Sequence, residues 1–157
     1  MTTQGTRWPV PRPMQTALEA ARKAADAGEV PVGAVIVKDG EVVAVAANAT
    51  RSPPDPTGHA EMRAIRMAAE RLGDDRLKGC DLYVTLEPCA MCAGAIAHAR
   101  IARLYYGASD PKGGGVEHGA RVFEQDQCLH APEVYAGLGE TEAAELLKEF
   151  FRELRER

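Results

Sequence analysis

Apolar residues recur at every third or fourth position near the beginning of the chain, and charged residues stand between them. This spacing predicts an amphipathic helix that ends near Gly28. Its apolar positions are Met14, Leu18, Ala21 and Ala25. Residues 1–12 precede this pattern and are expected to form a loose arm, and residues 13–157 are expected to form a single domain.

Two continuous apolar stretches follow the helix, at residues 32–38 and 41–47. Asp39 and Gly40 between them have the chemistry of a tight hairpin turn, so both stretches are predicted to be paired strands. Because both strands are continuously apolar, we expect the sheet to be covered on both of its faces.

The rest of the chain alternates between helical and strand patterns. A loop with three prolines spans residues 51–57, and an apolar stripe of helical spacing begins after it. Helices are predicted at 59–72, at 89–99 and from residue 140 or 141 onward, and strands at 82–86, 101–107 and 134–136. The last helix has an apolar stripe that runs from Ala143 to Leu154. This order predicts a three-layer α/β/α domain with a mixed central sheet of about five strands.

Composition narrows the class of protein. The chain has 157 residues, 45% of them hydrophobic, and a net charge of −4. These values are typical of a globular domain and argue against binding to nucleic acid through bulk charge, although a few placed cations suffice for local phosphate contacts. No apolar run suits a membrane span or a signal segment, so we expect a cytoplasmic protein with no membrane partner.

One pattern carries chemistry that the composition does not suggest. Cys89 and Cys92 follow Pro88 at a spacing that places both thiols on one face of a helix start, where thiolates are favoured. With His59 as an imidazole, they make a three-ligand set for Zn²⁺ that leaves the fourth position open for water, as in a catalytic site. Glu61 is then free to act as the acid and base.

The combination of H-x-E with a later P-C-x-x-C is the signature of zinc-dependent nucleobase deaminases. Four segments, in order along nearly the whole chain, resemble those of bacterial tRNA adenosine deaminases. They are EVPVGAV at 29–35, DPTGHAE at 55–61, LYVTLEPCAMCAGAI at 82–96 and GASDPK at 107–112. The resemblance implies a cytidine-deaminase-like fold, one Zn²⁺ per chain, a homodimer, and conversion of the wobble adenosine of a tRNA anticodon stem-loop to inosine.

The same resemblance implies which residues bind the substrate. Asn48 would hydrogen-bond the purine, and Asp110 would contact the nucleotide beside the target base. Lys112, Phe150 and Arg152 are further candidate RNA contacts. Taken alone, Asn48 is an ordinary turn residue, and Phe150 fits an apolar core equally well.

Other interpretations stay open. A deaminase of a free base, such as guanine, uses the same zinc core. A non-catalytic zinc-stabilised binding module is disfavoured because structural sites usually have four protein ligands. A thioredoxin-like use of the two cysteines leaves His59 and Glu61 unexplained. Cys80 is expected to be a buried apolar residue, and Cys128 with His130 is expected to have no metal role.

Overall fold

The computed structural model describes residues 9–156. Its elements in chain order are α1 (Arg12–Asp26), β1 (Gly33–Lys38), β2 (Glu41–Ala47), α2 (Ala60–Leu72), β3 (Cys80–Leu86), α3 (Ala90–Ala99), β4 (Arg103–Ala108), the short 3-10 helix η2 (Val122–Glu124), β5 (Glu133–Tyr135) and α4 (Glu140–Arg155). The five strands form one sheet in the order β2-β1-β3-β4-β5. β1 pairs antiparallel with β2 and β3, whereas β3, β4 and β5 are parallel.

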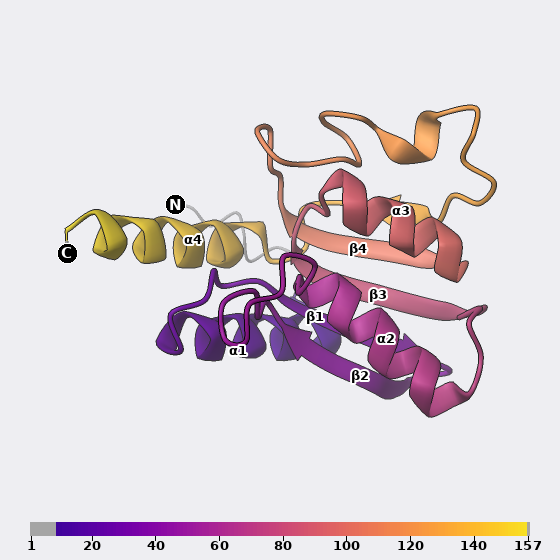
Figure 1. Ribbon diagram of the computed structural model, residues 1–157, viewed down its shortest axis with the longest axis horizontal. Helices are drawn as coiled ribbons and strands as arrows, with labels where there is room; N and C mark the ends of the chain where they lie inside the picture. The colour runs from indigo at the N-terminus through magenta and orange to yellow at the C-terminus, as the bar shows by residue number, and fades with distance from the viewer. Residues whose placement is uncertain (1–8, 157) are drawn as a thin grey trace.

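The helices cover the two faces of this sheet, which confirms the predicted three-layer architecture and mixed five-stranded sheet. α2 and α3 lie together on the face that is nearer the viewer in Figure 1. The larger core lies beneath them and includes Ile36, Leu82, Ile96 and Leu104. A smaller core on the opposite face joins α1 to the start of α4 through Met14, Leu18 and Ala143.

Close approach between α1 and β1 requires a glycine. A Cβ atom at Gly33 would lie 1.9 Å from the carbonyl oxygen of Ala17, a separation that no side chain can occupy. The backbone N–H of Gly33 also donates to the buried hydroxyl of Thr85 at 3.2 Å. The start of β1 is therefore held against both α1 and β3.

Three expectations from the sequence need correction. β2 is an edge strand that α1 and α2 both contact, yet its Val42 and Val45 are 53% and 37% exposed, so the cover over β2 is incomplete. Val10 packs against the smaller core and α1 begins at Arg12, so residues 10–12 are not loose, while residues 1–8 lie outside the described part of the chain. The single-domain prediction for residues 13–157 stays a prediction.

The third correction concerns α4. Its predicted apolar stripe runs to Leu154, yet Ala143 is the one buried residue of the helix. Phe151 and Leu154 are 40% and 42% exposed. Figure 1 shows the reason, because the second half of α4 runs past the sheet and away from the rest of the molecule. Within residues 9–156, no helix has both the length and the apolar character needed to cross a bilayer.

Candidate metal centre and active site

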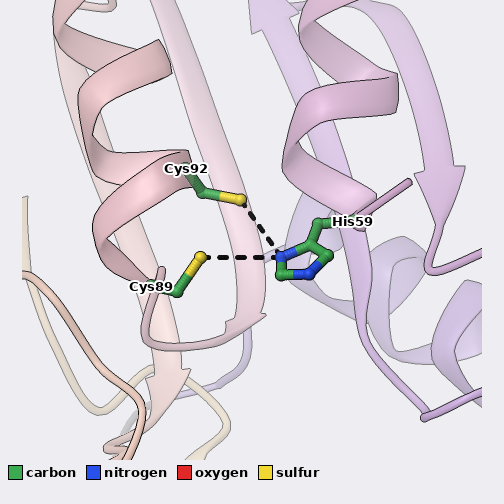
Figure 2. A group of neighbouring side chains, drawn as sticks. All are labelled: His59, Cys89 and Cys92. Atoms are coloured by element: carbon green, nitrogen blue, oxygen red, sulfur yellow. Dashed lines mark hydrogen bonds between the residues drawn. The ribbon is translucent and has the colours of Figure 1, made fainter. Parts of the chain in front are cut away.

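The N-termini of α2 and α3 meet above the sheet and bring three side chains together (Figure 2). His59 is the N-cap residue of α2, Cys89 is the N-cap residue of α3, and Cys92 lies in the first turn of α3. The Nδ1 atom of His59 is 3.6 Å from Sγ of Cys89 and 3.5 Å from Sγ of Cys92. We call these three residues the metal corner.

The metal corner has the geometry and the donors of a zinc site. Zn–S bonds near 2.3 Å and Zn–N bonds near 2.0 Å place tetrahedral ligands about 3.5 Å apart, which agrees with the two observed separations. Among the described residues, this is the one group of at least three metal-ligating side chains found close enough together to hold an ion. Two sulfurs and one imidazole nitrogen suit zinc and leave a fourth position open.

The two cysteines of the metal corner share a proton, and the resulting negative charge favours binding of a cation. A hydrogen bond from the Cys92 thiol lowers the pKa of Cys89 to about 5, although partial burial of Cys89 acts in the opposite direction. The same contact and the burial of Cys92 raise the pKa of the Cys92 thiol. The pair therefore carries one negative charge, and a bound cation would displace the remaining proton.

Glu61 lies in the first turn of α2, two residues after His59, and is 4% exposed. Burial raises the pKa of its carboxyl group to about 7, while the hydrogen bond with its own backbone N–H acts in the opposite direction. Cys89 and His59 are close enough for their charges to act on this carboxyl group, which places Glu61 against the metal corner. A carboxyl group with such a pKa can accept and return a proton near neutral pH.

Asn48 borders the metal corner from the end of β2. Its backbone N–H donates to Val32, and the N–H of the next residue, Ala49, donates to the carbonyl of Gly58 at 2.8 Å. The buried Glu29 holds the following turn by accepting the N–H groups of Thr50 and Arg51 at 3.0 and 3.1 Å. Asn48 is thus fixed beside the residue that precedes His59.

Asp110 and Lys112 lie in residues 110–118, which contain no helix or strand and which we call the 110–118 loop. The side chain of Asp110 accepts the N–H of Gly113 at 2.9 Å and closes a turn, and Lys112 is exposed. The loop is attached to Glu87, a residue that the sequence reasoning missed. In the sequence, the only indication of a role for Glu87 is that it directly precedes Pro88 of the cysteine motif. The sequence alone does not reveal its hydrogen-bond partners.

The structure does not bring Phe150 and Arg152 to the metal corner. Both lie in the second half of α4, which runs past the sheet, and Arg152 pairs with Glu149. The expectation for Cys80 is confirmed, because this residue is fully buried. The Cys128 thiol donates to the backbone carbonyl of His130, whose ring nitrogen contacts the carbonyl of Ile101, and the expectation that neither residue has a metal role stays a prediction.

Comparison with known proteins gives matches over most of the chain. A family model described as MafB19-like deaminase matches residues 11–155. A tRNA-specific adenosine deaminase of Agrobacterium fabrum is 61% identical over 142 residues, which cover 90% of this chain and 93% of that protein. A structure from studies of A-to-I editing by tRNA:A34 deaminases at the wobble position of transfer RNA is 61% identical, with a TM-score of 0.85, and covers 86% of this chain and 98% of its own.

A guanine deaminase is also similar, to a smaller extent. The structure of the enzyme from Bacillus subtilis is 40% identical over the matched region, with a TM-score of 0.60. The match covers 69% of this chain and 66% of that one. Both substrate classes considered from the sequence are therefore represented among the similar structures, and the tRNA class matches with the higher identity and TM-score.

Proposed function

The chain belongs to the family of tRNA-specific adenosine deaminases, and from this premise we propose that it converts adenosine to inosine at the wobble position of a tRNA anticodon. The observation that carries the proposal is the placement of Glu61 against the metal corner, at the meeting point of two helix N-termini. A thiolate pair, an imidazole and a separate buried carboxyl group are the parts that hydrolytic deamination of a nucleobase requires.

The metal corner would hold one Zn²⁺ through Nδ1 of His59 and the sulfurs of Cys89 and Cys92. When bound there, Zn²⁺ supplies a water of nearly neutral pKa at its open position. A bound zinc ion also accounts for the close approach of one imidazole and two cysteine sulfurs that form no disulfide.

Glu61 carries the proton transfers of the reaction. Its carboxylate accepts one proton from the attacking water, whose oxygen bonds to the amine-bearing carbon of adenine, and delivers this proton to the adjacent ring nitrogen. Glu61 then moves the proton of the new hydroxyl group to the exocyclic nitrogen. The bond from carbon to this nitrogen breaks, ammonia leaves, and the carbonyl group of inosine remains. Because burial brings the pKa of Glu61 to about 7, both the accepting and the donating form are accessible at neutral pH.

We assign purine binding to Asn48 and contact with the neighbouring nucleotide to Asp110. Within residues 9–156, the side-chain amide of Asn48 makes no hydrogen bond, so its donor and acceptor are free for a base edge. Lys112 supplies an exposed cation close to Asp110. Phe150 and Arg152 would meet a more distant part of the anticodon stem-loop from α4.

Deamination of free guanine is the second candidate, supported by the similarity to a guanine deaminase structure. A side-by-side assay separates the two functions. The zinc-loaded protein is incubated with an anticodon stem-loop bearing A at the wobble position, with the same stem-loop bearing G, and with free guanine and adenine. We expect inosine to form in the first RNA alone. Release of ammonia from guanine, without inosine in the RNA, would establish the second function.

We further propose that the chain acts as a homodimer in the cytoplasm, where its tRNA substrate is used. Family membership supports the dimer, and the exposed apolar residues Phe151 and Leu154 are compatible with a contact in an assembly. Sedimentation equilibrium at several protein concentrations measures the mass directly. A mass of one chain at all concentrations would contradict the dimer.

A further inference from the structure

The carboxylate of Glu87, directly after β3, anchors both ends of the 110–118 loop. Its Oε1 atom accepts the backbone N–H of Asp110 at 2.9 Å and lies 2.8 Å from Nδ1 of His118. Its Oε2 atom accepts three consecutive backbone N–H groups, from Val116 to His118, at 2.9 to 3.2 Å. The side chain of Glu87 is fully buried, so these contacts replace its hydration.

The 110–118 loop also packs directly on the N-terminus of α3. The N–H of Gly115 donates to the carbonyl of Pro88 at 2.8 Å. A Cβ atom at Gly115 would lie 2.5 Å from the backbone nitrogen of Ala90, and one at Gly114 would lie 2.5 Å from the Glu87 carboxyl group. These glycines allow the loop backbone to touch both its anchor and the helix turn that carries Cys89.

Only a carboxylate suits this position, because every group that faces the two oxygens is able to donate a hydrogen bond. Burial by itself would raise the pKa of Glu87, but the hydrogen bonds from Asp110, His118 and the neighbouring backbone hold it below its usual range. Glutamine has the same shape, yet its NH₂ group would have to face either the N–H of Asp110 or the three N–H groups from Val116 to His118. Alanine would leave all of these donors without their acceptor.

We propose that Glu87 is a positioning residue that holds the 110–118 loop in the conformation that presents Asp110 and Lys112 to the RNA strand. This inference rests on the proposed function, because the loop needs a nucleic-acid substrate to position. The hydrogen bonds of the Glu87 carboxylate all go to residues of the 110–118 loop, and none goes to the metal corner. Its effect passes through the loop, so it acts on substrate binding more than on the chemical step.

The test compares Glu87→Gln and Glu87→Ala with Asp81→Asn. Asp81 is the matched control, since its carboxylate lies near the opposite end of β3 and pairs with Arg103 at 2.8 Å, away from the loop. Three quantities are measured for each folded variant: the zinc content, the hydrogen exchange of the 110–118 amides, and kcat and KM on the anticodon stem-loop.

We expect every variant to retain one zinc per chain. Glu87→Ala should expose the 110–118 amides to exchange and raise KM by about 10- to 100-fold, with kcat within about threefold of the parent. The amide exchange and the KM of Glu87→Gln should lie between those of Glu87→Ala and the parent, because the remaining amide oxygen can still accept some of the hydrogen bonds. Asp81→Asn should match the parent in all three measurements.

Two results would overturn the inference. One is unchanged exchange of the loop amides in both Glu87 variants. The other is a loss confined to kcat, which would assign Glu87 to the chemical step or to the metal corner. Failure of the proposed function is distinguishable, because the parent protein itself would then leave the stem-loop unchanged while the exchange measurement still reported whether Glu87 holds the loop.

Discussion

The metal corner and the 110–118 loop lie against the same helix N-terminus, yet they are held in place by different means. His59, Cys89 and Cys92 sit at the ends of two regular helices, whose packing on the sheet fixes their backbone. The 110–118 loop has no regular structure and is anchored at both ends by the buried carboxylate of Glu87. Rigid elements thus carry the chemistry, and an irregular segment beside them is free to vary with the substrate.

This difference separates the rate of the chemical step from the choice of substrate. Changes in the metal corner or Glu61 should abolish turnover on any base. Changes in the 110–118 loop should act on one class of substrate and leave the metal in place. The predictions below test this division, beginning with the largest expected effect.

Loss of a metal ligand should have the largest effect. Cys92→Ser replaces a buried sulfur ligand with a hydroxyl group, so we expect zinc content and activity to fall to background. Cys80→Ser and Cys128→Ser are the matched controls, since both remove a thiol outside the metal corner. Metal analysis of the folded proteins checks the result. Loss of zinc from either folded control would refute the ligand assignment.

Glu61→Ala should retain zinc and the fold but lose turnover by about 10²–10⁴-fold or more, because general acid–base groups contribute this much and Glu61 serves several transfers. Circular dichroism and metal analysis establish that the protein is intact, and single-turnover kinetics measure the loss. Activity within a few-fold of the parent would mean that another residue moves the protons.

Asp110→Ala should impair the RNA reaction by about 10- to 100-fold while zinc content stays at one per chain. Part of this loss comes from the turn that Asp110 closes with Gly113. Asp110→Asn retains an oxygen for that hydrogen bond, so it should lose less. Equal loss in the two variants would show that the charge of Asp110, and not the shape of the turn, is what matters.

The smallest effect is expected at the outer end of α4. Leu154→Ser should change the free energy of unfolding by less than about 0.5 kcal/mol at low protein concentration, because the side chain is 42% exposed. Leu104→Ala, at a fully buried leucine, should cost about 2–5 kcal/mol in the same denaturation experiment. A large, concentration-dependent loss at Leu154 would instead show that this surface is covered in an assembly.

The regular elements were predictable because their patterns are local. The predicted strands and helices begin and end within two residues of the observed ones, and the combination of H-x-E with P-C-x-x-C indicated the three residues that meet in the metal corner. The partial exposure of β2 was not predictable, because its place at the edge of the sheet depends on the order of the strands and not on its own residues.

Glu87 and the second half of α4 show two further limits of the sequence. The partners of Glu87 lie 23 to 31 positions away in a segment without periodicity, so no spacing rule reveals them. α4 has an apolar stripe of helical period, but periodicity does not tell whether a core exists to receive it. The second half of α4 runs beyond the sheet, and Phe151 within it is 40% exposed.

The most direct test of the account is the inosine yield from the wobble-A anticodon stem-loop, measured beside ammonia release from free guanine with the same zinc-loaded protein. The account predicts near-complete conversion of the RNA, no activity on guanine, and loss of the RNA reaction in Glu61→Ala. Efficient deamination of guanine with an unchanged stem-loop would contradict it.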